Sequence, residues 1–173
     1  MTNNLDTELG GNLARTDDLA NTSRRVESSI FHTSLLPSEK RFGAWQESIG
    51  VMFEAALHPA IEGKSFNARV ESVLLDGIML SHVRSGATKF DRRTNRIVSD
   101  SIDHYMFQLF RRGSVEIELG SKRVKGRTGA LVGFDLGAIL DSANTDFDVL
   151  TVIIPRRRLE PHLRNPGSIH SLV

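Results

Sequence analysis

The sequence contains no cysteine, and this absence excludes several kinds of chemistry at once. Disulfide bonds, cysteine-ligated zinc, iron–sulfur clusters and thiol nucleophiles all require a side chain that the protein lacks. A chain without disulfides fits a reducing compartment, and we expect a cytoplasmic protein.

Excess charge of either sign is also missing. The 22 lysines and arginines balance 21 acidic residues, so the formal net charge is +1 and creates no large field for nucleic acid or anionic membranes. The longest strongly apolar run, 149–154, is too short to span a bilayer. The first ten residues contain Asp6 and Glu8 and no apolar run, unlike a secretory signal. We therefore expect a soluble protein with no membrane partner.

The length of 173 residues suits one domain with a tail. Residues 1–28 are polar, carry mixed charge and lack aromatic side chains, which predicts a disordered tail. One domain is expected over 29–163, and 164–173 is interpreted as the start of a linker.

A helix is predicted over about 38–57. Ser38 is a suitable N-cap, and Phe42, Trp45, Ile49 and later apolar residues recur at three- and four-residue steps. This stripe is typical of a helix face that packs on a core, and the proline after His58 ends the helical pattern.

From about 66 to 154 the pattern becomes that of short strands separated by turns. Asp76-Gly77, Arg112-Gly113 and Gly120-Ser121 are turn signals between apolar, β-branched runs. The polar stretch 87–100 is interpreted as a loop, and a short exit helix is expected over about 155–163 because proline is tolerated at a helix start. The pattern predicts a mainly β fold, a sandwich or barrel, with one helix before it and one after it.

The six histidines do not form a metal-binding pattern. Two histidines two positions apart on one strand face the same way and, with a third ligand and a later histidine facing them, would hold a metal ion in a β-barrel. The chain has no such pair, and His82 with His104 would supply only two ligands from different strands. We expect no metal, no cofactor and no catalytic residues.

Basic residues cluster at 92–96, 111–112 and 156–158. Solvated surface is the simplest interpretation of each cluster. Two alternatives stay open: arginines before the central strand would hold an anionic ligand at a barrel mouth, and those at 156–158 would dock an acidic neighbouring domain.

The stretch from Phe66 to Leu163 resembles the ligand-binding domain of AraC/XylS-type transcription regulators, in the subgroup with an AraC-binding-like cupin barrel. The most specific part is Leu150–Leu159, with the run Ile154-Pro155-Arg156-Arg157-Arg158-Leu159 at the exit from the last strand. Further residues carry the resemblance: Phe42 and Trp45 in the preceding helix, Val83-Arg84-Ser85, Arg92-Arg93-Thr94, Tyr105–Leu109, Gly113–Glu118, Thr128–Val132 and Phe134-Asp135-Leu136.

The resemblance implies a cytoplasmic bacterial regulator whose cupin-like, double-stranded β-barrel (jelly roll) senses a small-molecule effector or a protein partner. In that family a separate C-terminal pair of helix-turn-helix motifs reads DNA. This sequence stops at Val173, about where such a half would begin. DNA contact is thus expected only through a domain absent from this chain, which is either a fragment or a stand-alone sensor.

Three functions remain open from the sequence. Effector sensing would use a barrel interior lined by residues that we take as candidates: Arg84, Arg92, Tyr105, Phe107, Leu109, Leu131 and Phe134. A second hypothesis is a protein-interaction module that pairs with itself, as a homodimer, or with another protein and binds nothing small. The third is a cupin enzyme, which needs a metal cluster or an acid/base pair. We expect sensing and no enzymatic activity.

Overall fold

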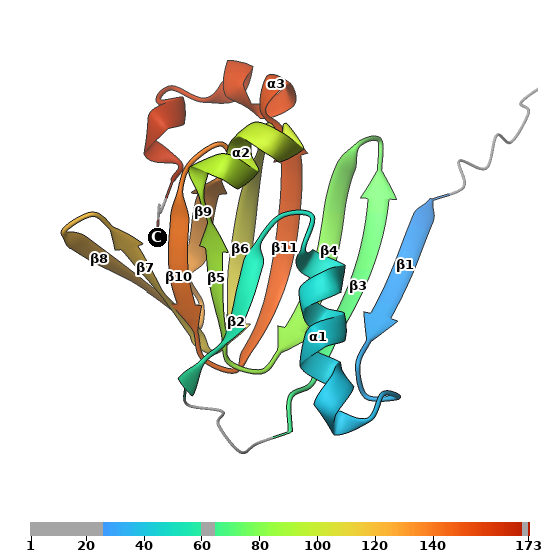
Figure 1. Cartoon of the computed structure of the whole chain (residues 1–173). Helices are drawn as coiled ribbons and strands as arrows, with labels where there is room; N and C mark the ends of the chain where they lie inside the picture. Colours follow the sequence, from blue (N-terminus) through green and yellow to red (C-terminus); the bar gives the residue numbers. More distant parts are fainter. Residues whose placement is uncertain (1–25, 60–64, 171–172) are drawn as a thin grey trace, which may run out of the picture.

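The computed structural model describes residues 26–59, 65–170 and Val173. Two antiparallel sheets pack face to face, and a helix lies along one open side between their edges (Figure 1). The first sheet has six strands in the spatial order β1 (Glu27–His32), β3 (Ala68–Leu75), β4 (Ile78–Ser85), β11 (Phe147–Pro155), β6 (His104–Arg112) and β9 (Leu131–Asp135).

The second sheet has five strands in the order β2 (Glu54–Leu57), β5 (Thr88–Arg92), β10 (Leu140–Asn144), β7 (Ser114–Leu119) and β8 (Lys122–Arg127). Consecutive strands often change sheet, as β4–β5 and β6–β7 do, which is the connectivity of a jelly-roll sandwich. The predicted fold class, mainly β with a cupin-like jelly roll, is confirmed.

The helices cover the side and one end of the sandwich. Helix α1 (Ser38–Ile49) runs along the open side, whereas α2 (Thr94–Asp100) and α3 (Arg156–Leu159) lie at the same end (Figure 1). Short 3-10 turns, Glu160–His162 and Pro166–Ser168, follow α3. No helix in the described part of the chain is long and apolar enough to cross a bilayer.

Strand alternation builds the core. In β11 the side chains of Phe147, Val149, Thr151 and Ile153 are buried between the sheets, and the residues between them face outward. A second, smaller cluster forms where α1 places Trp45 against Phe66, Ala68 and Ala87.

The predicted helix over 38–57 ends earlier, at Ile49, and residues 54–57 form β2 instead. The apolar spacing continues past Ile49, but Phe53 packs into the core between the sheets. Residues 54–57 then form sheet hydrogen bonds with β5, which they could not form in a continued helix.

The stretch 87–100, predicted as a loop, forms β5 and α2. β5 pairs on both sides, with β2 and β10, so its polar residues are fixed by backbone pairing and not by apolar pattern. Of the predicted disordered tail over 1–28, residues 1–25 lie outside the described residues, and β1 begins at Glu27. The expected exit helix over 155–163 is divided into α3 and a 3-10 turn.

Gly113 occupies a corner where the chain passes from one sheet to the other. Its φ is +86°, and a Cβ there would lie 2.3 Å from the Asp146 carbonyl oxygen. We predict that Gly113→Ala lowers the free energy of unfolding by about 3 kcal/mol, since it combines left-handed strain with a backbone clash.

The matched control is Gly77→Ala. Gly77 also has a positive φ, +75°, but a Cβ there meets nothing within 4 Å, so only about 1 kcal/mol should be lost. Urea unfolding of both variants measures the difference. Equal losses would show that the corner contact with Asp146 does not matter.

Candidate functional site

A cavity of about 310 Å³ lies between the inner face of the six-stranded sheet and the segment from α1 to Phe53. This volume is at the lower end of the range for small-molecule sites. The wall is mostly apolar and includes Phe31, Trp45, Ile49, Val51, Met52, Phe53, Val70, Met79, Val83, Phe90, Met106, Phe147 and Ile153, with Ser29, Ser48, Ser72, Ser81, Gln108 and Thr151 as its polar members.

Two polar groups of this wall lack a partner within the described structure. The indole N–H of Trp45 and the hydroxyl of Thr151 are buried and make no hydrogen bond. By contrast, the hydroxyls of Ser72 and Ser81 bond to each other at 2.9 Å. Buried polar groups are normally satisfied, so two unsatisfied ones in a cavity wall indicate a place where a bound molecule would contribute.

The structure separates the residues that the sequence suggested as ligand contacts. Met106 and Gln108 of β6 line the cavity, so the inner face of this strand is the opposite of the predicted one. Leu109 and Leu131 are 39% and 54% exposed on the outer face, and Phe107 lies opposite Gly133 on the same face. The prediction that Phe107, Leu109 and Leu131 point inward is wrong.

Tyr105 is fully buried, yet it too lies on the outer face of β6, beneath the exit of the last strand. The guanidinium of Arg156 donates to the Tyr105 hydroxyl at 2.5 Å and lies 4.5 Å from the ring centroid. Phe134 is the exception among the candidates, because it is 3% exposed and belongs to the core between the sheets.

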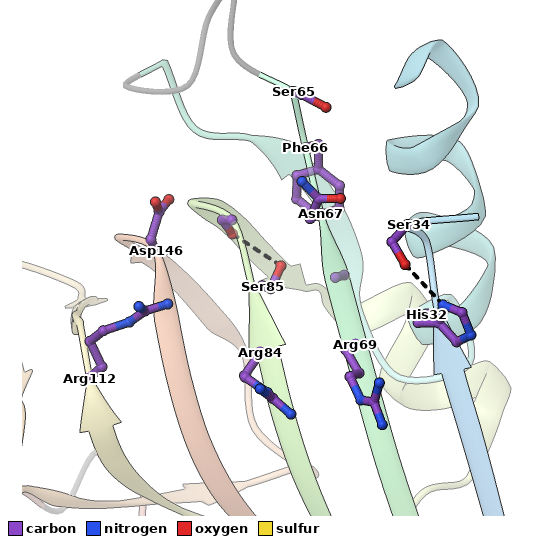
Figure 2. Close-up of a pocket in the computed structure, with 12 residues that line it drawn as sticks. His32, Ser34, Ser65, Phe66, Asn67, Arg69, Arg84, Ser85, Arg112 and Asp146 are labelled. Carbon is purple, nitrogen blue, oxygen red and sulfur yellow. Dashed lines mark hydrogen bonds between the residues drawn. The ribbon is translucent and has the colours of Figure 1, made fainter. Parts of the chain in front are cut away.

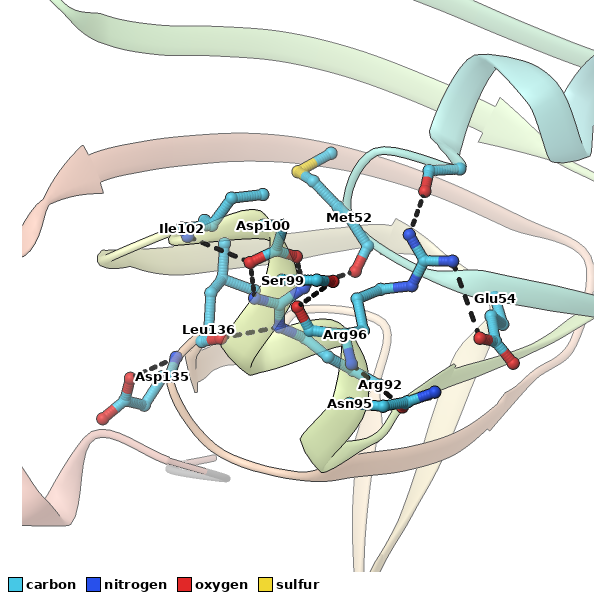
Figure 3. A network of polar contacts seen from close by, with 12 residues as sticks. Met52, Glu54, Arg92, Asn95, Arg96, Ser99, Asp100, Ile102, Asp135 and Leu136 are labelled. Carbon is cyan, nitrogen blue, oxygen red and sulfur yellow. Dashed lines mark hydrogen bonds and ion pairs between the residues drawn. The ribbon is translucent and has the colours of Figure 1, made fainter.

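Arg92 lies outside the cavity wall and is fully buried at the end of the sandwich. Its Nε donates to the Leu136 carbonyl at 2.6 Å, and one terminal nitrogen donates to the Met52 carbonyl at 2.7 Å. Asp100 accepts from both terminal nitrogens, at 2.6 and 3.0 Å (Figure 3). The guanidinium is thus occupied by protein groups on all three nitrogens.

The hydrogen bonds from Arg92, with burial opposing them, hold the pKa of Asp100 below its ordinary value. Arg96 reinforces the same end by donating to the Gly50 carbonyl and pairing with Glu54 at 3.5 Å (Figure 3). Both arginines therefore fix the backbone at Gly50 and Met52, beside and within the segment 51–53 that lines the cavity.

Arg84 lies on the outer face, in an open surface groove of about 420 Å³. Register places Arg69, Arg84, Asp148 and Arg112 side by side across β3, β4, β11 and β6, and Figure 2 shows the three arginines at the groove. Arg69 is paired with Glu71, which lowers the pKa of that carboxyl. Charges of both signs, three arginines with Glu71 and Asp148, are typical of a solvated sheet face.

Arg156 anchors the C-terminal segment through a second polar network. Besides Tyr105, it bonds to Asp103 at 2.5 Å and to Asp135. Burial alone lowers the pKa of Arg156, but the two carboxylates outweigh it and raise the pKa. The Asp135 N–H donates to Nδ1 of His170 at 3.3 Å, and burial lowers the pKa of this imidazole.

The two histidines weighed as metal ligands lie on β4 and β6, on either side of β11, and at different levels of the sheet. His82 is opposite Leu150 and bonds to Asp148 at 2.9 Å, whereas His104 is opposite Pro155. Within the described ranges no group of three or more His, Asp or Glu side chains is arranged to hold a metal ion.

Comparison with known proteins agrees with this architecture. Residues 47–172 match the sequence profile of the AraC-binding-like domain. The crystal structure of the AraC-like transcriptional activator CuxR aligns with a TM-score of 0.70 and 22% identity, over 78% of this chain and 50% of that one. The chain therefore spans half the length of that activator, and the likeness at this identity establishes the fold.

Two further solved structures align less well. The EutQ protein of Clostridium difficile aligns with a TM-score of 0.40 and 12% identity, over 63% of this chain and 75% of that one. Ectoine synthase from P. lautus aligns with a TM-score of 0.37 and 14% identity, over 55% of this chain and 71% of that one. Likeness this low supports no statement about chemistry, and no curated protein matches the chain.

We predict that Asp100→Ala lowers the free energy of unfolding by about 3 kcal/mol, because it leaves the Arg92 guanidinium buried without its counter-charge. The control is Asp141→Ala, which removes only an exposed ion pair to Arg93 at 3.5 Å and should cost under about 1 kcal/mol. Chemical denaturation at pH 7 compares the two.

The same pair predicts a pH dependence. Since the folded pKa of Asp100 is depressed, its stabilisation is fully present above the unfolded value near 3.8 and is lost as pH falls through the lower folded value. Unfolding free energy should therefore decline less steeply below pH 4 in Asp100→Ala than in the unsubstituted protein. If the unfolding free energy declines equally steeply in both proteins below pH 4, Asp100 does not contribute to the pH dependence.

Proposed function

The chain belongs to the AraC-binding-like domain family, whose profile covers residues 47–172, and on this premise we propose that it is the effector-sensing part of a bacterial AraC-type transcription regulator. The effector binds in the cavity between the six-stranded sheet and α1. DNA is read by a helix-turn-helix half that is not part of this sequence. The family resemblance expected from the sequence is confirmed.

One observation carries the proposal: the sandwich is left open where its wall has unsatisfied polar groups. Protein cores are packed to high density, and an unfilled volume costs dispersion contacts as well as apolar burial. Trp45 and Thr151 add the cost of two buried polar groups without partners. A ligand in this cavity would recover both losses, whereas a domain built only for stability would fill the space.

The polar networks provide a route by which ligand binding in the cavity would affect the C-terminal segment. Met52 lines the cavity, and its carbonyl is bonded to Arg92, which is also bonded to the carbonyl of Leu136. The neighbouring Asp135 holds Arg156 and His170 at the C-terminal exit. We propose that an effector which moves 50–53 shifts this chain of contacts between two arrangements.

We predict that binding is visible through the single tryptophan of the sequence, Trp45. A small molecule that enters the cavity should change Trp45 emission and raise the melting temperature, corresponding to about 2.7 kcal/mol at one hundred times its Kd. Fluorescence titration combined with a thermal-shift screen of neutral, acidic and basic compounds provides the measurement.

A cavity-filling variant, Ser81→Leu, supplies the control. It should stay folded and lose both responses, because leucine occupies the space above β4. If no compound stabilises the protein, or if Ser81→Leu responds equally, the cavity is not an effector site.

A second candidate function, homodimerisation, is favoured by a specific surface. Leu150, Leu109 and Leu131 lie side by side on the outer face of β11, β6 and β9, and are 41%, 39% and 54% exposed. Clustered exposed leucines are typical of an interaction surface. We call these three residues the outer leucine row.

If this row forms a dimer, sedimentation should show concentration-dependent association, and Leu109→Lys should shift the protein to monomer without abolishing the ligand response. Val98→Lys changes an exposed apolar residue on α2, outside the row, and should leave association unchanged. A protein that stays monomeric at every concentration would contradict the dimer function and leave effector sensing intact.

A further inference from the structure

A continuous row of uncharged polar side chains crosses the sheet at the floor of the cavity. Strand register places Ser29 opposite Ser72, Ser72 opposite Ser81, Ser81 opposite Thr151, and Thr151 opposite Gln108. All five line the cavity. They come from five neighbouring strands, so only the folded sheet brings them together. We call these five residues the polar row.

The rows on either side of it are apolar over β3, β4, β11 and β6, whereas the exposed Glu27 occupies one of these levels on the edge strand β1. One inward-facing row contains Phe31, Val70, Val83 and Val149, and the other contains Met79, Ile153, Met106 and Phe134. Because each inward row is two residues from the next, the hydroxyl and amide groups on the part of this sheet that lines the cavity lie at a single level. The buried hydroxyl of Ser85, further along β4, lies outside the cavity wall and donates to the Gly86 carbonyl. A ligand would meet oxygen- or nitrogen-bearing groups along one line and hydrocarbon on both sides of that line.

The polar row reaches the protein surface at one end. Ser29 is exposed on β1, which is an edge strand, whereas Thr151 in the middle of the sheet is 5% exposed. Helix α1 supplies the opposite wall through Trp45, Ser48 and Ile49 (Figure 1). The row therefore leads from solvent at the sheet edge into the interior.

No ionisable side chain is present among the described residues that line the cavity. A carboxylate or ammonium group placed there would lose its hydration without gaining a counter-charge, which is strongly unfavourable. The fully buried guanidinium of Arg92 is already occupied by Asp100 and two carbonyls. Among the described residues, those of the wall offer neutral hydrogen-bonding groups and no charged ones.

We propose that the cavity selects an uncharged small molecule with an apolar body and hydroxyl or carbonyl oxygen along one edge, such as a neutral alcohol, ketone or ester. The apolar body packs between α1 and the two apolar rows. Its oxygen bonds to the polar row, where the Thr151 hydroxyl has no protein partner. This inference rests on the proposed function and adds the chemical class of the effector.

The test uses four probes with the same phenyl body: 2-phenylethanol, phenylacetate, 2-phenylethylamine and ethylbenzene. Titration followed by Trp45 fluorescence and by the side-chain amide NMR signal of Gln108 gives each Kd. We expect the neutral alcohol to bind at least about tenfold more tightly than the anion and the cation, because the site has no compensating charge. The affinity of 2-phenylethanol should also exceed that of ethylbenzene by about two- to tenfold, which is the contribution of one neutral hydrogen bond.

Two isosteric variants separate a role in binding from a role in folding. Thr151→Val should weaken the binding of 2-phenylethanol about two- to tenfold. It should leave the melting temperature unchanged or higher, since the lost hydroxyl has no protein partner. Thr88→Val removes a hydroxyl that donates to the Gly86 carbonyl at 2.8 Å, and should lower the melting temperature without changing the Kd.

The outcomes distinguish this inference from the proposed function. Equal or tighter binding of phenylacetate or 2-phenylethylamine overturns the ligand class but keeps the cavity as an effector site. Ethylbenzene binding as tightly as 2-phenylethanol, or an unchanged Kd in Thr151→Val, overturns the role of the polar row. Absence of saturable binding by 2-phenylethanol also overturns the inference, whereas the proposed function fails only if the wider screen finds no ligand.

Discussion

The buried guanidinium of Arg92 is the constraint on which the arrangement of the site depends. A charge removed from water needs a counter-charge and a partner for every donor, and Arg92 obtains these from Asp100 and from the carbonyls of Met52 and Leu136. Those partners come from α2, from the segment after α1 and from the segment after β9. One side chain thus fixes three segments, including the cavity wall around Met52.

The chemistry of the two faces of the six-stranded sheet follows from alternation along its strands. Outward, Arg69, Arg84, Asp148 and Arg112 form a charged row at one level. Inward, at another level, the polar row is uncharged and flanked by hydrocarbon. Charge on the outer face remains hydrated and costs little, whereas the same charge inward would need a partner that the wall does not contain. The face that a residue occupies decides whether it contributes to solubility or to recognition.

The sequence predicted the fold class because turn residues and short apolar runs are local signals. Asp76-Gly77 and Gly113 do adopt positive φ values where turns were expected. The inward face of β6 was not predictable in the same way, since Tyr105 and Met106 are both buried, one beneath Arg156 and the other between the sheets. Alternation does not distinguish two buried faces. The polar row also escaped prediction, because Ser72, Thr151 and Gln108 become neighbours only through strand register.

The same residues that give the cavity its chemistry also create its volume. Away from α1, the space between the sheets is filled by large side chains such as Phe110 and Phe134. At the polar row, Ser72, Ser81 and Thr151 place small side chains, and the space above them stays open. Filling this space with larger apolar residues would increase buried area and remove the unsatisfied hydroxyl together. Small polar residues at these positions therefore weaken packing and supply hydrogen-bonding groups at one place, a combination that benefits the protein only when a ligand occupies the site.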